Sequence, residues 1–333
     1  MINNQYSNTH NVLVELVGSL QKVSNVIDAY FDHIQQREMV NPLLAEGGIR
    51  SVGNNEALPP EFFKGFGIRR LILDSPHGRL SFSDKYFTDM IGQKAASFNW
   101  HDLKSDLILD DLKMLFANCQ IVEFENWSDR QNASDIWDNL RRDVIVPLNK
   151  KDFDFIFYLG DTSKKFAFDV DEILDIISGY ALHGRVTLIL DGQNAANLWD
   201  RVEGDNSLSE ITSTPGLNEK CRSLFDTMDI SHLILLDSFS LAISFTKQNH
   251  FEITNCKTFG TLKSERKYFD VGYILGLILK FDLLHSIIMG LAVSGAFAEN
   301  GTKPDSKGLI QFIEKYMEEI ESFRPENNHL SVV

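Results

Sequence analysis

Four short apolar runs, each followed at once by a small polar cluster, constrain the fold of this 333-residue chain more than any other feature. The runs are residues 71–73 before Asp74, 155–159 before Gly160 and Asp161, 186–190 before Asp191, and 233–236 before Asp237 and Ser238. Nearly continuous apolar strands of this length are typical of a sheet covered on both faces, which favours parallel pairing.

Helical patterns alternate with these runs, at residues 135–142 and 170–182. A strand, a helix and a strand over residues 154–190 form a βαβ unit. We therefore predict an α/β fold of three α/β/α layers with a largely parallel sheet. A short hairpin is expected over residues 242–254, followed by helices at 270–281, 284–299 and 308–322.

The N-terminal region carries the clearest periodic pattern in the chain. Its apolar residues follow a 3-4-3-4 spacing that places one seam on a helix. The seam consists of Leu13, Leu16, Leu20, Val23, Ile27, Tyr30 and Ile34. Two interpretations remain open: a helix through which copies of the chain form a homo-oligomer, or an amphipathic helix packed on the chain's own core.

The domain organisation follows from these patterns. Residues 1–45 form a helical N-terminal segment, and residues 46–65 read as a linker because glycines, asparagines and two adjacent prolines gather there. Residues 66–325 form the α/β domain, and residues 326–333 a tail.

The composition argues against some classes of binding partner and indicates the cellular compartment. The formal charge of −15, from 47 acidic and 32 basic residues, argues against binding nucleic acid or an anionic membrane. The three cysteines lie far apart, so a cytoplasmic protein without disulfides is expected. The apolar segment 271–298 is interrupted by charged residues, so we expect neither half to be long enough to cross a bilayer and interpret it as a buried helical hairpin.

The strand ends carry candidate chemistry. In an open parallel sheet ligands bind at the carboxyl ends of the strands, where Asp74, Asp161, Asp191 and Asp237 would hold Mg²⁺ if they converged. The alternative is that each Asp caps the turn or helix after its strand. No glycine-rich phosphate loop is present, and the nearest approach, residues 160–165, has a single glycine and two lysines.

The C-terminal half resembles the ribokinase-like (PfkB) small-molecule kinases. Residues 233–246 resemble their strand, turn and strand, and 270–300 their terminal helical hairpin. Most of the likeness lies in Gly-Leu-Ile-Leu at 276–279 and in the small and apolar residues at 290–298. Upstream, residues 186–194 resemble the family's strand ending in Asp and Asn.

The resemblance implies a site. Asp270 would be the base that takes the proton from the acceptor hydroxyl, Asp191 and Asn194 would contact the substrate, and Asp237 and Ser238 would lie near ATP and its Mg²⁺. The family's Gly-Ala-Gly-Asp motif is replaced here by Tyr268, Phe269, Asp270 and Val271. Bulky side chains there would keep the backbone from the phosphates.

Two functions stay open at this point. The first is a diverged ribokinase-like phosphotransferase acting on a small molecule, a sugar or a nucleoside. The alternative is a catalytically inactive α/β scaffold or regulatory protein that binds a protein partner and assembles through the N-terminal seam.

Overall fold

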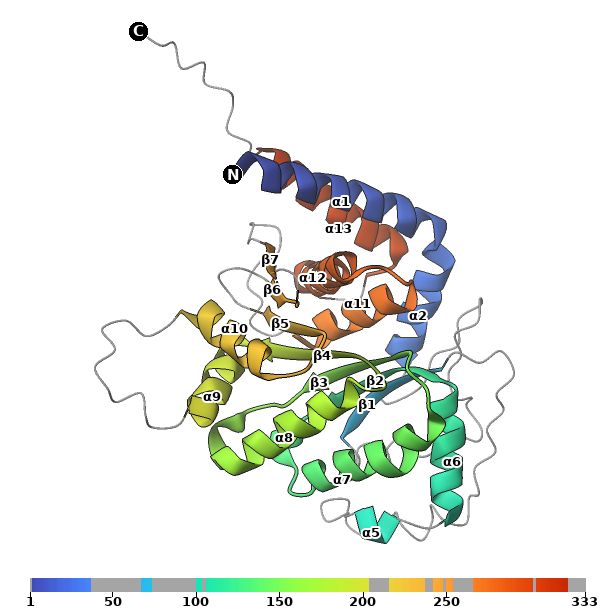
Figure 1. Cartoon of the computed structure of the whole chain (residues 1–333). Coiled ribbons are helices and arrows are strands. Elements are labelled where there is room, and N and C mark those ends of the chain that lie inside the picture. Colours follow the sequence, from blue (N-terminus) through green and yellow to red (C-terminus); the bar gives the residue numbers. More distant parts are fainter. Residues whose placement is uncertain are drawn as a thin grey trace, which may run out of the picture. The chain divides into compact units, whose positions relative to one another are not determined.

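A computed structural model describes residues 2–36, 67–73, 100–103, 106–203, 216–236, 242–247, 250–253, 266–301 and 304–322 (Figure 1). The chain forms two compact units. The sheet unit contains residues 37–237 and 242–252, and the helical unit contains residues 1–36, 238–241 and 253–333. The helical unit thus combines both ends of the chain.

The sheet unit is built on seven strands in sequential order. They are β1 (Ile68–Leu73), β2 (Cys119–Glu125), β3 (Phe153–Tyr158), β4 (Gly184–Asp191), β5 (His232–Leu236), β6 (Ala242–Phe245) and β7 (His250–Ile253). Strands β2 to β5 are parallel, whereas β1 pairs antiparallel with β2 and β6 antiparallel with β5. The predicted α/β fold with a largely parallel sheet, and the βαβ unit within it, are confirmed.

Helices join the strands along the chain. They are α5 (Trp100–Leu103), α6 (Asp106–Ala117), α7 (Ala133–Leu140), α8 (Ala167–Tyr180), α9 (Gly192–Glu203) and α10 (Leu217–Thr227). Short 3-10 turns, η2 (Trp127–Asp129) and η5 (Thr162–Lys164), follow β2 and β3, and a π-helical turn (Arg141–Ile145) extends α7.

One face of the sheet packs on α7 and α8 through aromatic rings. Phe124 of β2 stacks on Phe157 of β3 with ring centroids 4.7 Å apart, and Trp137 of α7 and Tyr180 of α8 lie against both rings. These four side chains are fully buried. Buried aromatic rings contribute large apolar areas, so this cluster fixes the two helices on the sheet.

Polar residues alternate with these rings along the same strands. Arg185 binds both carboxylate oxygens of Asp154, at 2.6 and 2.9 Å, and Arg69 lies 3.5 Å from Glu123. Because side chains alternate between the two faces of a strand, these ion pairs lie on the face opposite to the aromatic cluster.

The helical unit contains α1 (Ile2–Lys22), α2 (Ser24–Gln36), α11 (Arg266–Ile278), α12 (Leu283–Asn300) and α13 (Ser306–Ser322). A turn at Val23 divides the N-terminal helix into α1 and α2. The seam residues Leu13, Leu16 and Leu20 are fully buried, and α1 packs on α13. The chain's own core therefore covers the seam, as the second interpretation predicted. The side chain of Ile34 lies outside the described residues.

The predicted hairpin of α11 and α12 is confirmed, and glycines allow its close packing. A methyl group at Gly276 would lie 2.7 Å from the Cα of Ser286, and one at Gly272 would press on the carbonyl oxygen of Met289. We expected neither half of segment 271–298 to be long enough to cross a bilayer, and for α12 this is wrong, because its length and composition are those of a membrane span. However, 61% of α12 is buried inside the protein.

Candidate functional site

The carboxyl ends of β3 and β4 bring together two predicted substrate-binding residues. Asp191 ends β4, and Asn194 lies in the first turn of α9. The backbone N–H of Asn194 donates to Asp191 Oδ1 at 2.8 Å, and its side-chain Nδ2 donates to Asp191 Oδ2 at 2.6 Å. Asp191 thus caps α9, which is the role that its place after a strand predicts.

Tyr158, the last residue of β3, joins this pair from the neighbouring strand. Its hydroxyl donates to Asp191 Oδ2 at 3.0 Å and accepts a hydrogen bond from Asn194 Nδ2 at 2.5 Å. Tyr158 is 8% exposed and Asn194 is 9% exposed. Three polar side chains from two strands and one helix therefore form a single, nearly buried network, which we call the carboxyl-edge network.

A second set of hydrogen bonds ties the loop after β3 to α9. Asp161 Oδ1 accepts from the backbone N–H of Ser163 and from Asn197 Nδ2, both at 2.9 Å. Asn197 Oδ1 accepts in turn from Gln193 Nε2, and Arg201 donates to the carbonyl oxygen of Ser163. The hydrogen bonds from Ser163 are the main reason why the pKa of Asp161 is lowered.

Glycine is required at the start of this loop. Gly160 has φ of +78°, a conformation that residues with a side chain rarely adopt. A methyl group at this position would also collide with the hydroxyl oxygen of Ser128. The loop after β3 is therefore held both by its backbone geometry and by its contacts with η2 and α9.

The proposed base, Asp270, lies in the helical unit. It follows the first turn of α11, which begins at Arg266, and it is 2% exposed. Its neighbour Phe269 is fully buried and lies so close to α12 that a methyl group at Gly290 would be 2.7 Å from its ring. Tyr268 stacks on Phe297 with centroids 3.5 Å apart. The two residues that precede Asp270 thus pack within the hairpin.

The other predicted site residues are placed as follows. Asp237 and Ser238, expected near the nucleotide, and Asp74 lie outside the described residues. Among the residues that the structure describes, no three His, Cys, Asp or Glu side chains gather to hold a metal ion. Asp161 and Asp191 each bond to residues of the turn or helix that follows them.

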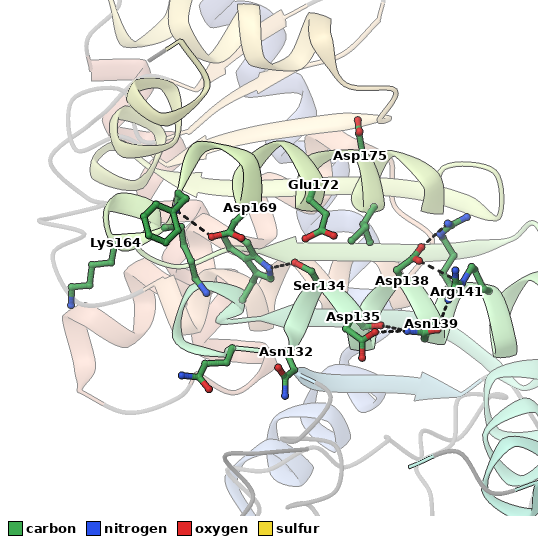
Figure 2. Close-up of a pocket in the computed structure, with 16 residues that line it drawn as sticks. Asn132, Ser134, Asp135, Asp138, Asn139, Arg141, Lys164, Asp169, Glu172 and Asp175 are labelled. Atoms are coloured by element: carbon green, nitrogen blue, oxygen red, sulfur yellow. Dashed lines mark hydrogen bonds and ion pairs between the residues drawn. The ribbon is translucent and has the colours of Figure 1, made fainter. Parts of the chain in front are cut away.

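A groove of about 930 Å³ opens between α7 and α8, beginning at η5 (Figure 2). Asp135 and Asp138 line it from α7, and Asp169, Glu172 and Asp175 from α8. Several of its charges are already engaged. Asp138 pairs with Arg141 at 2.7 Å and with Arg142 at 3.5 Å, and Asp169 accepts from the backbone N–H of Phe166.

Lys165, at the η5 end of this groove, is engaged as well. It lies over the ring of Trp127, with Nζ 4.7 Å from the ring centroid, and donates to the carbonyl oxygen of Arg130 at 3.1 Å. The groove was not predicted, although carboxylates spaced three residues apart on each helix are a readable signal of one acidic stripe per helix. Because most of its ionic groups are satisfied, the groove is the weaker candidate for a ligand site.

Comparison with known proteins gives one family match and several distant structural matches. The model of the prokaryotic ketohexokinase family matches residues 80–316, which extends the expected resemblance toward the N-terminus. No curated protein matches the chain.

Three of the similar solved structures are small-molecule kinases. Ribokinase from Thermotoga maritima is 10% identical with a TM-score of 0.44, and the match covers 61% of this chain and 59% of that one. Adenosine kinase from Sinorhizobium meliloti is 13% identical with a TM-score of 0.45, and the match covers 66% and 59%. Aminoimidazole riboside kinase from Salmonella enterica is 15% identical with a TM-score of 0.41, and the match covers 57% and 61%.

The chain thus spans about three fifths of the length of these structures. The family match is broader, because it covers well over half of the chain and includes β2 to β7, the carboxyl-edge network and the α11–α12 hairpin. The resemblance to the ribokinase-like kinases, which rested on the C-terminal half of the sequence, is therefore confirmed. The chain belongs to the prokaryotic ketohexokinase family, whose members are of the PfkB type.

Proposed function

We propose that this protein binds a ketohexose or a related sugar at the carboxyl ends of β3 and β4 and phosphorylates it with ATP. The family match over residues 80–316 is the observation that carries the proposal. The place of the polar residues supports it, since ligands of open α/β sheets bind beyond the carboxyl ends of the strands.

The carboxyl-edge network suits a sugar. Carboxylate and amide groups accept and donate hydrogen bonds to hydroxyls, and Asp191 and Asn194 are held rigidly by each other and by Tyr158. A site whose side chains are fixed before the ligand arrives loses less conformational entropy on binding. In this proposal Asp191 and Asn194 contact the sugar.

Asp270 is the proposed general base. Its carboxylate would take the proton of the attacking hydroxyl, a role worth about 10² to 10⁴ in rate. A general base contributes to phosphoryl transfer by positioning and deprotonating the acceptor, while charge stabilisation comes from groups around the phosphates.

The residues around the proposed phosphate site fit ATP only in part. Asp270 is present, but the residue before it is the buried Phe269, at a place where backbone N–H groups would need open access to the phosphates. Mg²⁺ is commonly bound by one or two carboxylates together with the phosphates of the substrate, so it does not need a preformed metal cluster. Asp237 and Ser238 stay proposals for the binding of ATP.

The residues Phe269 and Asp270 also support a second candidate function. The burial of Asp270 and Phe269 favours a relative that binds the sugar without transferring phosphate. Such a protein would act as a sugar-responsive scaffold or regulator. The N-terminal seam gives this alternative no support, since the chain's own core buries most of it.

A turnover assay with one substitution and one control tests the kinase function against the non-catalytic one. Wild-type protein is assayed for ADP production from ATP and Mg²⁺ with D-fructose as the probe. Asp270→Asn should lower turnover by about 100-fold or more and leave the melting temperature near that of the wild type. Asp171→Asn, an equivalent change at an exposed residue of α8, should have no effect.

The outcomes of this assay are distinct. Unchanged turnover in Asp270→Asn would show that Asp270 is not the base. Saturable binding of D-fructose by a wild type without turnover would favour the non-catalytic function. Neither binding nor turnover with any ketohexose would contradict the proposal as a whole.

A further inference from the structure

The hydroxyl of Tyr158 lies at the centre of the carboxyl-edge network. It contacts Asp191 Oδ2 and Asn194 Nδ2, and both of these atoms also contact each other. Tyr158 belongs to β3, whereas its two partners belong to β4 and α9. The contact therefore depends on the pairing of two parallel strands. Tyr158 lies outside the turn that contains Asp191 and Asn194, yet its hydroxyl contacts both side chains.

The available protons determine how the Asn194 amide is oriented. A tyrosine hydroxyl has one proton, which goes to the carboxylate of Asp191, so its oxygen accepts from Asn194. The two protons of the Asn194 amide nitrogen then go to Tyr158 and to Asp191 Oδ2. The opposite orientation would set the amide oxygen against a carboxylate oxygen, which is repulsive.

The oxygens left for a ligand follow from this arrangement. Asp191 Oδ1 is occupied by the backbone N–H of Asn194. Within the described part of the chain, Asn194 Oδ1 makes no hydrogen bond, and it is not among the buried polar atoms that lack a partner. The amide therefore presents an acceptor, which suits a ligand that donates hydrogen bonds through hydroxyl groups.

We propose that Tyr158 is a positioning residue that keeps the amide oxygen of Asn194 turned outward, so that the site accepts hydrogen bonds from the hydroxyls of the ligand. This inference rests on the proposed sugar-binding function, which it deepens. Without the hydroxyl of Tyr158, one amide proton loses its acceptor and only Asp191 Oδ2 still holds the amide nitrogen, so the amide oxygen is held less firmly in its outward position.

The test uses two Tyr→Phe variants. Tyr158→Phe removes the hydroxyl at the site. Tyr180→Phe is the matched control, because Tyr180 is also buried and its hydroxyl donates to the carbonyl oxygen of Trp137 at 2.7 Å, within the aromatic cluster. Tyr158→Phe loses two hydrogen bonds and Tyr180→Phe loses one, but only the first variant should change the site.

Binding of D-fructose is measured by calorimetry, and the steady-state constants are measured for both substrates. Tyr158→Phe should weaken D-fructose binding about tenfold, because the loosened Asn194 amide has to be ordered again when the sugar binds. The KM for the sugar should rise while the KM for ATP stays constant. Tyr180→Phe should change neither constant. Equal effects of the two variants would overturn the proposal, because they would show a structural role only.

A second measurement does not depend on any sugar. In ¹H–¹⁵N NMR spectra of the free protein, the side-chain amide signals of Asn194 should shift and exchange faster with solvent in Tyr158→Phe, and stay unchanged in Tyr180→Phe. Unchanged Asn194 signals in Tyr158→Phe would overturn the positioning role. If wild type does not bind D-fructose but these signals shift, the sugar-binding function fails and the positioning role stands.

Discussion

The carboxyl-edge network and the α11–α12 hairpin use small and polar residues in opposite ways. At the carboxyl ends of β3 and β4, polar side chains bond to one another in a nearly buried cluster beside a loop that begins at Gly160. In the hairpin, Gly272, Gly276 and Gly290 leave room for the neighbouring helix. The first region keeps polar groups ready for a ligand, whereas the second devotes its glycines to packing.

The glycines of the α11–α12 hairpin serve packing and not anion binding. A glycine serves anion binding only where its backbone N–H groups are exposed at a helix start, and it serves packing where another backbone fills the space of its missing side chain. The described glycines of α11 lie after Asp270, and both face α12. Small residues in this hairpin are therefore evidence of close packing rather than of a phosphate site.

The largest expected effect is in the hairpin. Gly272→Ala should lower the free energy of unfolding by about 3 kcal/mol, because its methyl group would press on the backbone of Met289, which cannot easily move. The measurement is urea denaturation followed by circular dichroism.

Gly18→Ala in α1 is the matched control for this change. Among the described residues, no atom outside the helix's own backbone lies within 4 Å of the added methyl group. Because alanine favours a helix over glycine, stability should rise by up to about 1 kcal/mol. Similar effects of the two substitutions would contradict the packing role of Gly272.

Acid should weaken the sheet unit through His232. Burial, with a smaller contribution from the charge of Arg185, lowers the pKa of His232 from 6.5 to about 4. The neutral form is favoured in the folded state, so this stability is complete above pH 6.5 and is lost as the pH falls toward 4. The loss should be about 2 kcal/mol, below the full value of the shift because part of the ring is exposed.

The measurement is the unfolding free energy of wild type and of His232→Gln at several pH values between 7 and 4. The difference between the two proteins should shrink as the pH falls, because glutamine does not titrate. A constant difference across this range would show that His232 does not become charged on unfolding.

The smallest expected loss of stability is at the carboxyl edge. Asp191→Ala should cost about 1 to 2 kcal/mol, since it removes the cap of α9 and the acceptor of Tyr158. Binding of D-fructose should fall far more than stability does. If the variant keeps its sugar affinity but loses stability, Asp191 is only a structural cap. The carboxyl edge would then not differ from the hairpin as a ligand-binding region.

Sequence patterns revealed the strands whose apolar runs are continuous, such as β3 and β4. They did not reveal β2, because Gln120, Glu123 and Glu125 interrupt its apolar residues. Glu123 is only 2% exposed, but its charge is matched by Arg69 of β1. Ion pairing with a residue distant in sequence leaves no local signal, so this strand becomes evident only once the sheet is formed.

The candidate site likewise contains residues that the sequence predicts and residues that it does not. Asp191 and Asn194 are predictable because they directly follow an apolar strand. Tyr158 and Asn197 are not, since their roles depend on the register of β3 against β4 and on the path of α9. Asp270 was identified from a family motif, and its burial one turn into α11 could not be read from that motif.

Hydrogen–deuterium exchange of the wild-type protein, with and without D-fructose and Mg²⁺·ATP, tests most directly whether the carboxyl edge is the ligand site. We expect exchange in residues 159–164 and 192–197 to slow when the ligands are present. Slower exchange confined to α7 and α8 around the groove, or no change in the loop after β3 and the start of α9, would contradict this expectation.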